Sequence, residues 1–80
     1  RMQSVIVHIA NEDAIVCEVE NLPDPQDITI LVHNLRRRDG MDVHYLDEDV
    51  TSVIFPLHRV NFIQVLPSAE INEVVGFVRE

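Results

Sequence analysis

The sequence predicts a mainly all-β fold, a small and strongly bent antiparallel barrel of five or six strands. Short runs of β-branched and aromatic residues recur along the chain, separated by turn-forming residues. The stretch 51–68 places two such runs on either side of Pro56, which ends a strand because it has no N–H to donate. The few residues after Pro56 allow one tight turn, and strand, turn, strand is how a small barrel closes.

The length of 80 residues predicts one domain, 1–80, with the barrel over about 4–67 and a C-terminal element over 68–80. A domain of this size buries only about 60% of its unfolded surface, so its stability margin is thin. Cys17 is the only cysteine, which excludes an intrachain disulfide. Within an alternating strand we interpret Cys17 as a small buried hydrophobe.

The first half of the chain contains three predicted strands. Residues 3–10 form the first, with two rather apolar faces, and Asn and Asp make 11–13 a turn. Residues 14–22 form the second, because apolar side chains alternate with Glu18 and Glu20. The two prolines of 22–27 predict a loop, and 28–35 form a third strand that is apolar on both faces.

The second half predicts three further strands. Asp39-Gly40 favours a tight hairpin turn, after which 41–46 return as a fourth strand. The acidic residues 47–49 form a turn. Residues 53–55 and 60–66 are then the fifth and sixth strands.

The C-terminal element at about 69–79 has two interpretations. Ser68 suits a helix N-cap, and Ile71, Val74, Val75 and Val78 fall on one helical face. The many β-branched residues and Gly76 favour an extra strand instead. We favour the helix slightly. In either form the segment presents an apolar face that must cover its own barrel or a neighbour.

Two segments give the chain a resemblance to the Sm-like family and, more loosely, to SH3-like small barrels. Residues 5–11, VIVHIAN, are similar to an Sm-type first strand and turn, and 59–68, RVNFIQVLPS, resemble the last strand of bacterial Sm-like RNA chaperones. The resemblance implies a strongly bent antiparallel sheet and rings in which the edge strands of neighbouring subunits pair.

The chain departs from that family at three places. Glu12 follows Asn11 where Sm-type proteins usually have Gly, and Arg59-Val60 stands where the chaperone has a Lys-His pair. The predicted helix follows the barrel, whereas the family's helix precedes it. Of the family's RNA-binding residues, the resemblance therefore carries over only the charge of Arg59.

The charge balance disfavours general nucleic-acid binding. The net charge is −8, there is no lysine, and three of the six arginines are Arg36, Arg37 and Arg38. Nucleic acid as a partner stays open only if symmetry gathers several such basic spots. No run is apolar enough to span a bilayer, and no secretory pattern precedes the first strand, so we expect a cytoplasmic protein without a membrane partner.

The candidate ligand- or anion-binding residues are the three arginines of the hairpin and Arg59. Guanidinium groups suit phosphate and carboxylate. The alternative, which we favour for the cluster, is that these arginines pair with the chain's many acids, within or between subunits.

Four histidines, His8, His33, His44 and His58, raise the question of a metal. No HxH, HxxxH or CxxC spacing is present, so we predict no metal and no cofactor. His33 and His44 would lie on opposite strands of one hairpin. The acids at 18, 20 and 47–49 are interpreted as solvated, and Cys17 lacks the positive surroundings of a nucleophile, so we predict no catalytic residues and no enzyme.

The apolar content of 46% is the most informative feature for function. A small barrel has one interior, so strands that are apolar on both faces indicate burial against other copies or the C-terminal segment. We expect a non-enzymatic, self-associating binding or scaffold module, a homo-oligomer through edge strands and the C-terminal element, with a protein partner possible. The alternatives are an Sm-like ring that binds RNA and a small-ligand or metal-binding protein acting through histidines.

Overall fold

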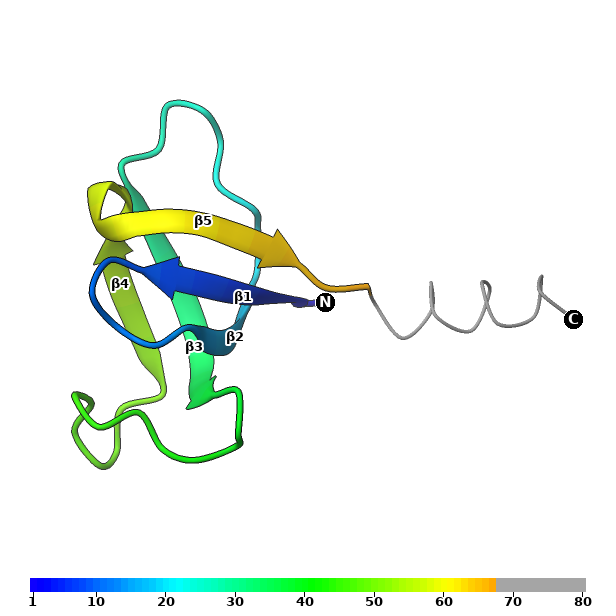
Figure 1. Cartoon of the computed structure of the whole chain (residues 1–80). Coiled ribbons are helices and arrows are strands. Elements are labelled where there is room, and N and C mark those ends of the chain that lie inside the picture. The colour runs from blue at the N-terminus through cyan, green and yellow to red at the C-terminus, as the bar shows by residue number, and fades with distance from the viewer. Residues whose placement is uncertain (68–80) are drawn as a thin grey trace, which may run out of the picture.

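A computed structural model describes residues 1–67 and shows a curled half-barrel of five antiparallel strands (Figure 1). The strands are β1 (Gln3–Ile9), β2 (Ile15–Val19), β3 (Thr29–Arg37), β4 (Ser52–Pro56) and β5 (Val60–Val65). A short 3₁₀ turn, η1 (Leu57–Arg59), joins β4 to β5. The predicted antiparallel β fold is therefore confirmed over this part of the chain. The predicted C-terminal element at 69–79 lies outside the described residues.

The five strands form one sheet in the order β4-β3-β2-β1-β5. The last two strands are neighbours in the chain, yet they lie at opposite ends of the sheet. The register places Val5 opposite both Cys17 of β2 and Val65 of β5. Because η1 is so short, the sheet must curl to bring its two ends within reach of each other, and Figure 1 shows β1 and β5 crossing β3 and β4 steeply.

Two irregularities accompany the curl. The β1–β5 register shifts between His8 and Ile9, and the β2–β3 register shifts between Val16 and Glu18. Asn34, opposite the second shift, has a φ of 56°, in the left-handed region that Asn tolerates better than most residues. Bulges of this kind increase the local twist and bend of a sheet.

The core lies on the concave face, chiefly on the three central strands. Every second residue of β1 and β2 is buried, as the sequence alternation predicted, and β3 adds Ile30 and Val32. Cys17 is fully buried among them, which confirms its interpretation as a small hydrophobe. The inner residues of β4 and β5 are only partly buried against this core.

The predicted fourth strand at 41–46 is wrong. The Asp39-Gly40 turn does form, with Gly40 at a φ of +85° and its N–H donating to Arg37 O at 2.9 Å. The chain pairs back only at Met41, whose carbonyl accepts the Arg37 N–H at 2.9 Å, and then continues through further turns. Farther along β3, the edge from Asn34 to Thr29 is taken by residues 51–56. Of the apolar residues in this segment, Val43 is buried in the core, while Met41 and Tyr45 are exposed.

The other predicted turns and strands within residues 1–67 hold in outline. The turn at 11–13, the loop at 22–27 and the strand–turn–strand arrangement after residue 51 are all present. The strand ends differ by a few residues, most at the third strand, which runs on to Arg37. Within residues 1–67 no helix is long and apolar enough to cross a membrane.

Candidate functional site

The predicted arginine cluster lies at the exposed end of β3 and in the turn after it. The Nη1 of Arg36 donates to Asn34 O at 3.0 Å, and the Nη2 of Arg37 pairs with Asp39 Oδ2 at 2.8 Å. This ion pair and the Met41 N–H, which donates to the same carboxylate, hold the pKa of Asp39 below its usual value, the Met41 contact contributing most. Two of the three guanidinium groups are thus engaged locally, but only that of Arg37 pairs with an acid, because Arg36 donates to a backbone carbonyl.

The third arginine of the cluster, Arg38, is exposed and makes no ion pair within residues 1–67. It lines a surface depression with Arg37, Asp39, Asp13 and Ala14. Two of these five residues are acidic, so the depression has no strong positive character. It offers a phosphate little net attraction.

Arg59 lies at the other side of the β1–β2 turn. Its backbone carbonyl accepts the Ala10 N–H at 2.8 Å, which fixes η1 against that turn. Its side chain borders a hollow lined by Ile9, Glu12, Tyr45, Phe55 and Pro56. Arg59 and Arg38 therefore each line a hollow that includes residues of the β1–β2 turn, but they share no pocket.

The four histidines do not converge. Residues 1–67 contain no group of three or more His, Cys, Asp or Glu side chains positioned to hold a metal. His8 stacks on Phe62 and hydrogen-bonds Gln64, and His44 packs edge-on against Tyr45. The hairpin that would have paired His33 with His44 does not form, because 41–46 is not a strand.

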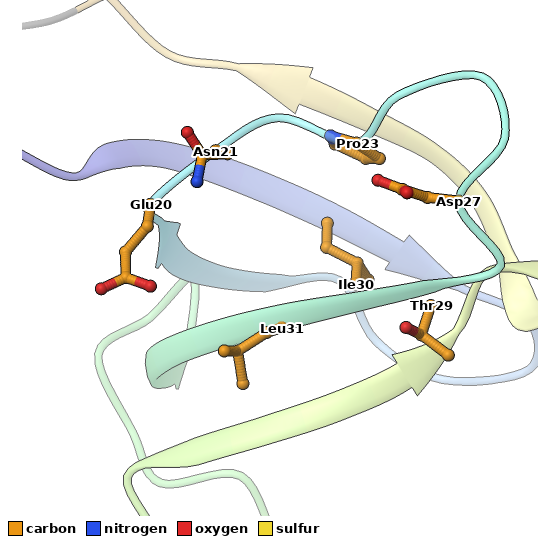
Figure 2. Close-up of a pocket in the computed structure, with 7 residues that line it drawn as sticks. All are labelled: Glu20, Asn21, Pro23, Asp27, Thr29, Ile30 and Leu31. Carbon is orange, nitrogen blue, oxygen red and sulfur yellow. The ribbon is translucent and has the colours of Figure 1, made fainter.

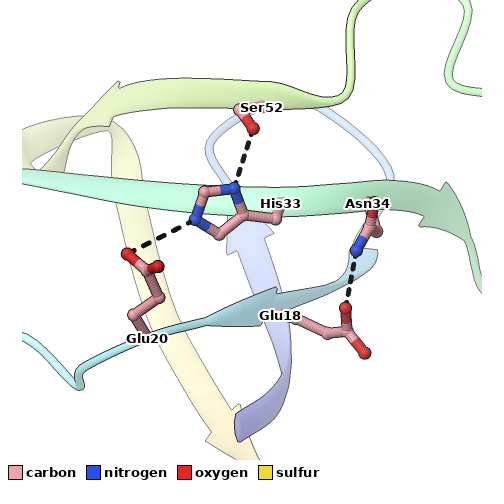
Figure 3. Close-up of polar contacts among 5 residues, drawn as sticks. All are labelled: Glu18, Glu20, His33, Asn34 and Ser52. Atoms are coloured by element: carbon pink, nitrogen blue, oxygen red, sulfur yellow. Dashed lines mark hydrogen bonds and ion pairs between the residues drawn. The ribbon is translucent and has the colours of Figure 1, made fainter. Parts of the chain in front are cut away.

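His33 has the most developed surroundings of the four, at the outer face of β3 (Figure 3). Its Nδ1 hydrogen-bonds Ser52 Oγ at 2.7 Å, and its Nε2 lies 3.8 Å from Glu20 Oε1. The Nε2 atom is shielded from solvent and has no hydrogen-bond partner among the described residues. Serine, histidine and carboxylate occur together in hydrolases, but there the carboxylate bonds directly to the imidazole. The distance here is too long for that bond.

These contacts tie strands together instead. The His33–Ser52 bond joins β3 to β4, and the other side of the same imidazole faces Glu20, the residue after β2 (Figure 3). Beside it, Asn34 Nδ2 donates to Glu18 Oε1 at 2.7 Å and closes the bulge between β2 and β3. A matching contact at the other end of the sheet joins His8 of β1 to Gln64 of β5 at 2.7 Å.

A further surface hollow lies where the loop after β2 crosses the start of β3 (Figure 2). Its lining combines the carboxylates of Glu20 and Asp27 with the apolar side chains of Pro23, Ile30 and Leu31. The loop itself is held by Asp24 and Asp27, whose backbone and side-chain groups bond each other at 2.9 and 3.0 Å. The hollow has no cationic side chain and no buried polar group aimed into it.

The two open edges of the sheet are the most distinctive surfaces of the described chain. We define them as the unpaired sides of β4 and β5, which have no further strand beside them in residues 1–67. Neither strand contains a charged residue, in a chain that is 25% charged. Natural proteins usually protect exposed edges with charges, especially lysine, since an unpaired strand recruits other strands.

Large apolar side chains accompany the open edges. Ile54 of β4 is 65% exposed and lies directly opposite Leu31 of β3, which is 45% exposed. On β5, Phe62 is 55% and Val65 53% exposed. Where β3 and β4 pair, the outer face has no Asp, Glu, Lys or Arg, and it is made by Thr29, Leu31, His33, Ser52, Ile54 and Pro56.

Sequence reasoning identified the apolar excess but not the residues that carry it. It named arginines as the candidate binding groups, and two of them turn out to be engaged close to their own turn. The sequence feature that could have pointed to the open edges is an absence of charge, since no Asp, Glu, Lys or Arg occurs in 50–58 or 60–69.

Comparisons of the chain with models of protein families, with curated proteins and with solved structures find no match. The candidate site therefore rests on geometry alone.

Proposed function

We propose that the protein is a non-enzymatic, self-associating scaffold or binding module that assembles through its open edges. The main observation behind this proposal is that both terminal strands of the sheet, β4 and β5, have no charged residue and expose large apolar residues. Unpaired N–H and C=O groups on such a strand are a template for pairing with another chain.

The half-barrel gives this proposal an energetic reason. The central strands bury every second side chain, but no residue of β4 or β5 is buried. Burying apolar surface is worth about 25 cal/mol per Å², so covering the side chains of the open edges favours association. A small domain with a thin stability margin gains proportionately from this.

The resemblance to the Sm-like family belongs to the same proposal. It is supported by five bent antiparallel strands, and by the single turn η1 between the last two. It would make the module one of the small barrels that work as assemblies.

The test is the molar mass in solution, measured by size-exclusion chromatography with light scattering over a range of micromolar concentrations. One chain has a mass of 9.2 kDa, and we expect a multiple of this value. A mass of one chain at every concentration would contradict the proposal.

A second candidate is an RNA-binding ring of the Sm-like type. It is favoured by one observation: Arg38 and Arg59 each line a hollow that includes residues of the β1–β2 turn, and their guanidinium groups make no ion pair within residues 1–67. A filter-binding titration with single-stranded RNA at two salt concentrations separates the candidates, since phosphate contacts strengthen as salt falls. Absence of binding at low salt would exclude the ring's RNA function and leave self-association standing.

A further inference from the structure

The residues with free backbone N–H and C=O groups lie on different faces of the sheet at the two open edges. This difference determines which strand of a second copy each edge can pair with. In an antiparallel ladder, residues alternate between pointing their N–H and C=O at the neighbouring strand and pointing them away. The backbone hydrogen bonds at the strand ends therefore fix which residues present free backbone groups.

On β4 these residues belong to the outer face. Asn34 N donates to Thr51 O at 2.7 Å and Leu57 N to Ile28 O at 2.8 Å, so odd-numbered residues point at β3. The free backbone groups are then those of Ser52 and Ile54 and the carbonyl of Pro56. Their side chains lie on the outer face, since Val53 and Phe55 pack against the core.

On β5 the free residues belong to the inner face. Leu66 N donates to Ser4 O at 3.0 Å, so even-numbered residues point at β1 in the regular part of the strand. The free backbone groups are those of Ile63 and Val65. Their side chains share the inner face, where Ile63 packs against the core.

Because the free backbone groups belong to outer-face residues on β4 and to inner-face residues on β5, the possible strand pairings between two copies are not equivalent. Residues directly opposite in an antiparallel ladder carry their side chains on the same face of the sheet. Pairing β4 of one copy with β5 of the next would therefore join the outer face of one sheet to the inner face of the other. Pairing β4 with β4 of a second copy, around a two-fold axis, keeps both faces continuous.

The regularity of β4 favours it over a β5–β5 contact. The β3–β4 register runs without a shift from Thr29–Pro56 to His33–Ser52, whereas the register of β5 shifts opposite His8 and Ile9. Bulges interrupt a ladder and protect an edge, and β5 has one. The only proline in β4 is Pro56, at the end of the strand, and the N–H that it lacks would face outward.

The distribution of charge also favours a second copy of this chain as the partner that pairs with β4. A chain of net charge −8 repels its own copies wherever acids meet, and β4 and the residues of β3 paired with it, Thr29–His33, have no Asp, Glu, Lys or Arg side chain. A basic partner strand would find no carboxylate on β4 to pair with, since the nearest acids of the outer face, Glu18 and Glu20, lie on the far side of β3. An apolar, uncharged strand is complementary to itself.

We infer that two copies of this chain pair β4 with β4 in antiparallel register about a two-fold axis, with Ile54 opposite Ile54. This register overlaps the whole strand, because Ile54 is the central residue of Ser52–Pro56. Leu31 of each copy flanks the pair on the outer face. The inference rests on the proposed function and specifies its partner and symmetry.

The first experiment places a carboxylate on each open edge in turn. Ile54→Glu and Val65→Glu are matched, since both residues are apolar, more than half exposed, and have free backbone groups. We expect Ile54→Glu to raise the dimer dissociation constant at least about a hundredfold, because two apolar side chains are lost and two like charges meet. Val65→Glu should leave the dimer mass unchanged. Circular dichroism checks that both variants fold.

The second experiment tests the symmetry. In the proposed register Ile54→Cys places two thiols in one hydrogen-bonded pair, about 5.5 Å apart between Cα atoms, which a disulfide can bridge. We expect rapid oxidation to a covalent dimer, and slow oxidation for Val65→Cys. The native Cys17 is buried and contributes nothing in the folded state.

The outcomes separate the two proposals. A wild-type chain that is monomeric overturns both. An oligomer that Val65→Glu dissociates, and Ile54→Glu does not, keeps self-association and overturns the β4 interface. A dimer that Ile54→Glu dissociates but Ile54→Cys does not cross-link overturns the two-fold register, and a mass above two chains overturns the closed dimer.

Discussion

The centre and the ends of this sheet are built from similar residues but reach different states. In β1 and β2, valine, isoleucine and cysteine on the inner face are almost completely buried. In β4 and β5, the inner residues Val53, Phe55 and Ile63 remain only partly buried, while the inner residue Val65 near the end of β5 and the outer residues Ile54 and Phe62 are exposed. Burial thus follows position in the sheet. The central strands have neighbours on both sides, and the terminal strands have one.

The contrast teaches that hydrophobicity along the sequence overstates what one copy can bury. A 3.6- or 2-residue period identifies a buried face, but a strand that is apolar on both faces needs material outside its own sheet. The outer residues Leu31 and Ile54 show this, since they form an apolar pair with nothing from the described chain above it.

The largest expected effect separates a central residue from a terminal one. Ile15→Ala, at a residue that is 1% exposed, should lower the free energy of unfolding by about 2–5 kcal/mol, because it leaves a cavity in the core. Val65→Ala on β5 should lower it by only about 0.5 kcal/mol, as for other surface changes. Urea unfolding at neutral pH measures both. Equal decreases in the free energy of unfolding for the two variants would contradict the difference between the central and the terminal strands.

An intermediate effect concerns pH and the central thiol. Burial raises the pKa of Cys17 from 9.0 to about 11, an effect that Arg36 opposes and Glu18 reinforces. The unfolded chain therefore releases this proton at lower pH than the folded chain. Stability is intact below pH 9 and falls as pH rises from about 9 to 11, by about 2–3 kcal/mol in total.

Urea unfolding of the wild type and of Cys17→Ala across this pH range measures the effect. The variant is less stable at pH 7 because it leaves a small cavity, but its stability should fall less between pH 9 and 11. Parallel profiles for the two chains would contradict the assignment of the pH dependence to Cys17.

The smallest effect lies at the bulge between the centre and the β4 end. Asn34 has a φ of 56° and its amide donates to Glu18. Asn34→Ala should cost about 1 kcal/mol more than Asn34→Gly, because both remove the amide but only glycine adopts this φ freely. Urea unfolding of the two variants gives the comparison, and an equally stable alanine variant would show that the bulge relaxes.

The sequence predicted where the strands lie in the chain better than which strands pair with each other. Residues 14–22 alternate clearly, 3–10 and 28–35 are apolar runs bounded by turn residues, and Pro56 with the residues after it correctly predicted the turn into β5. These features are local, since they depend on turn chemistry and on the two-residue period. The burial of Cys17 followed from the same period.

What failed depends on competition between distant segments. Residues 41–46 alternate as well as β4 does, but a full hairpin would also need the β3 edge near His33, and Ser52–Pro56 pairs with β3 from His33 to Thr29. The contact of His33 with Ser52 follows from that pairing and was not foreseeable from spacing. The candidate arginines were chosen for their charge, and local acceptors such as Asp39 engage that charge.

The turn η1 has a consequence for how this chain folds. It connects the two strands that lie farthest apart in the sheet, so β5 finds its partner in β1, at the other end of the described sequence. Closing so long a loop costs entropy that local hairpins such as β1–β2 do not pay. The β5 strand therefore joins a sheet whose other pairs can already have formed, and until it does, the nascent chain has β1 as an open edge in addition to β4.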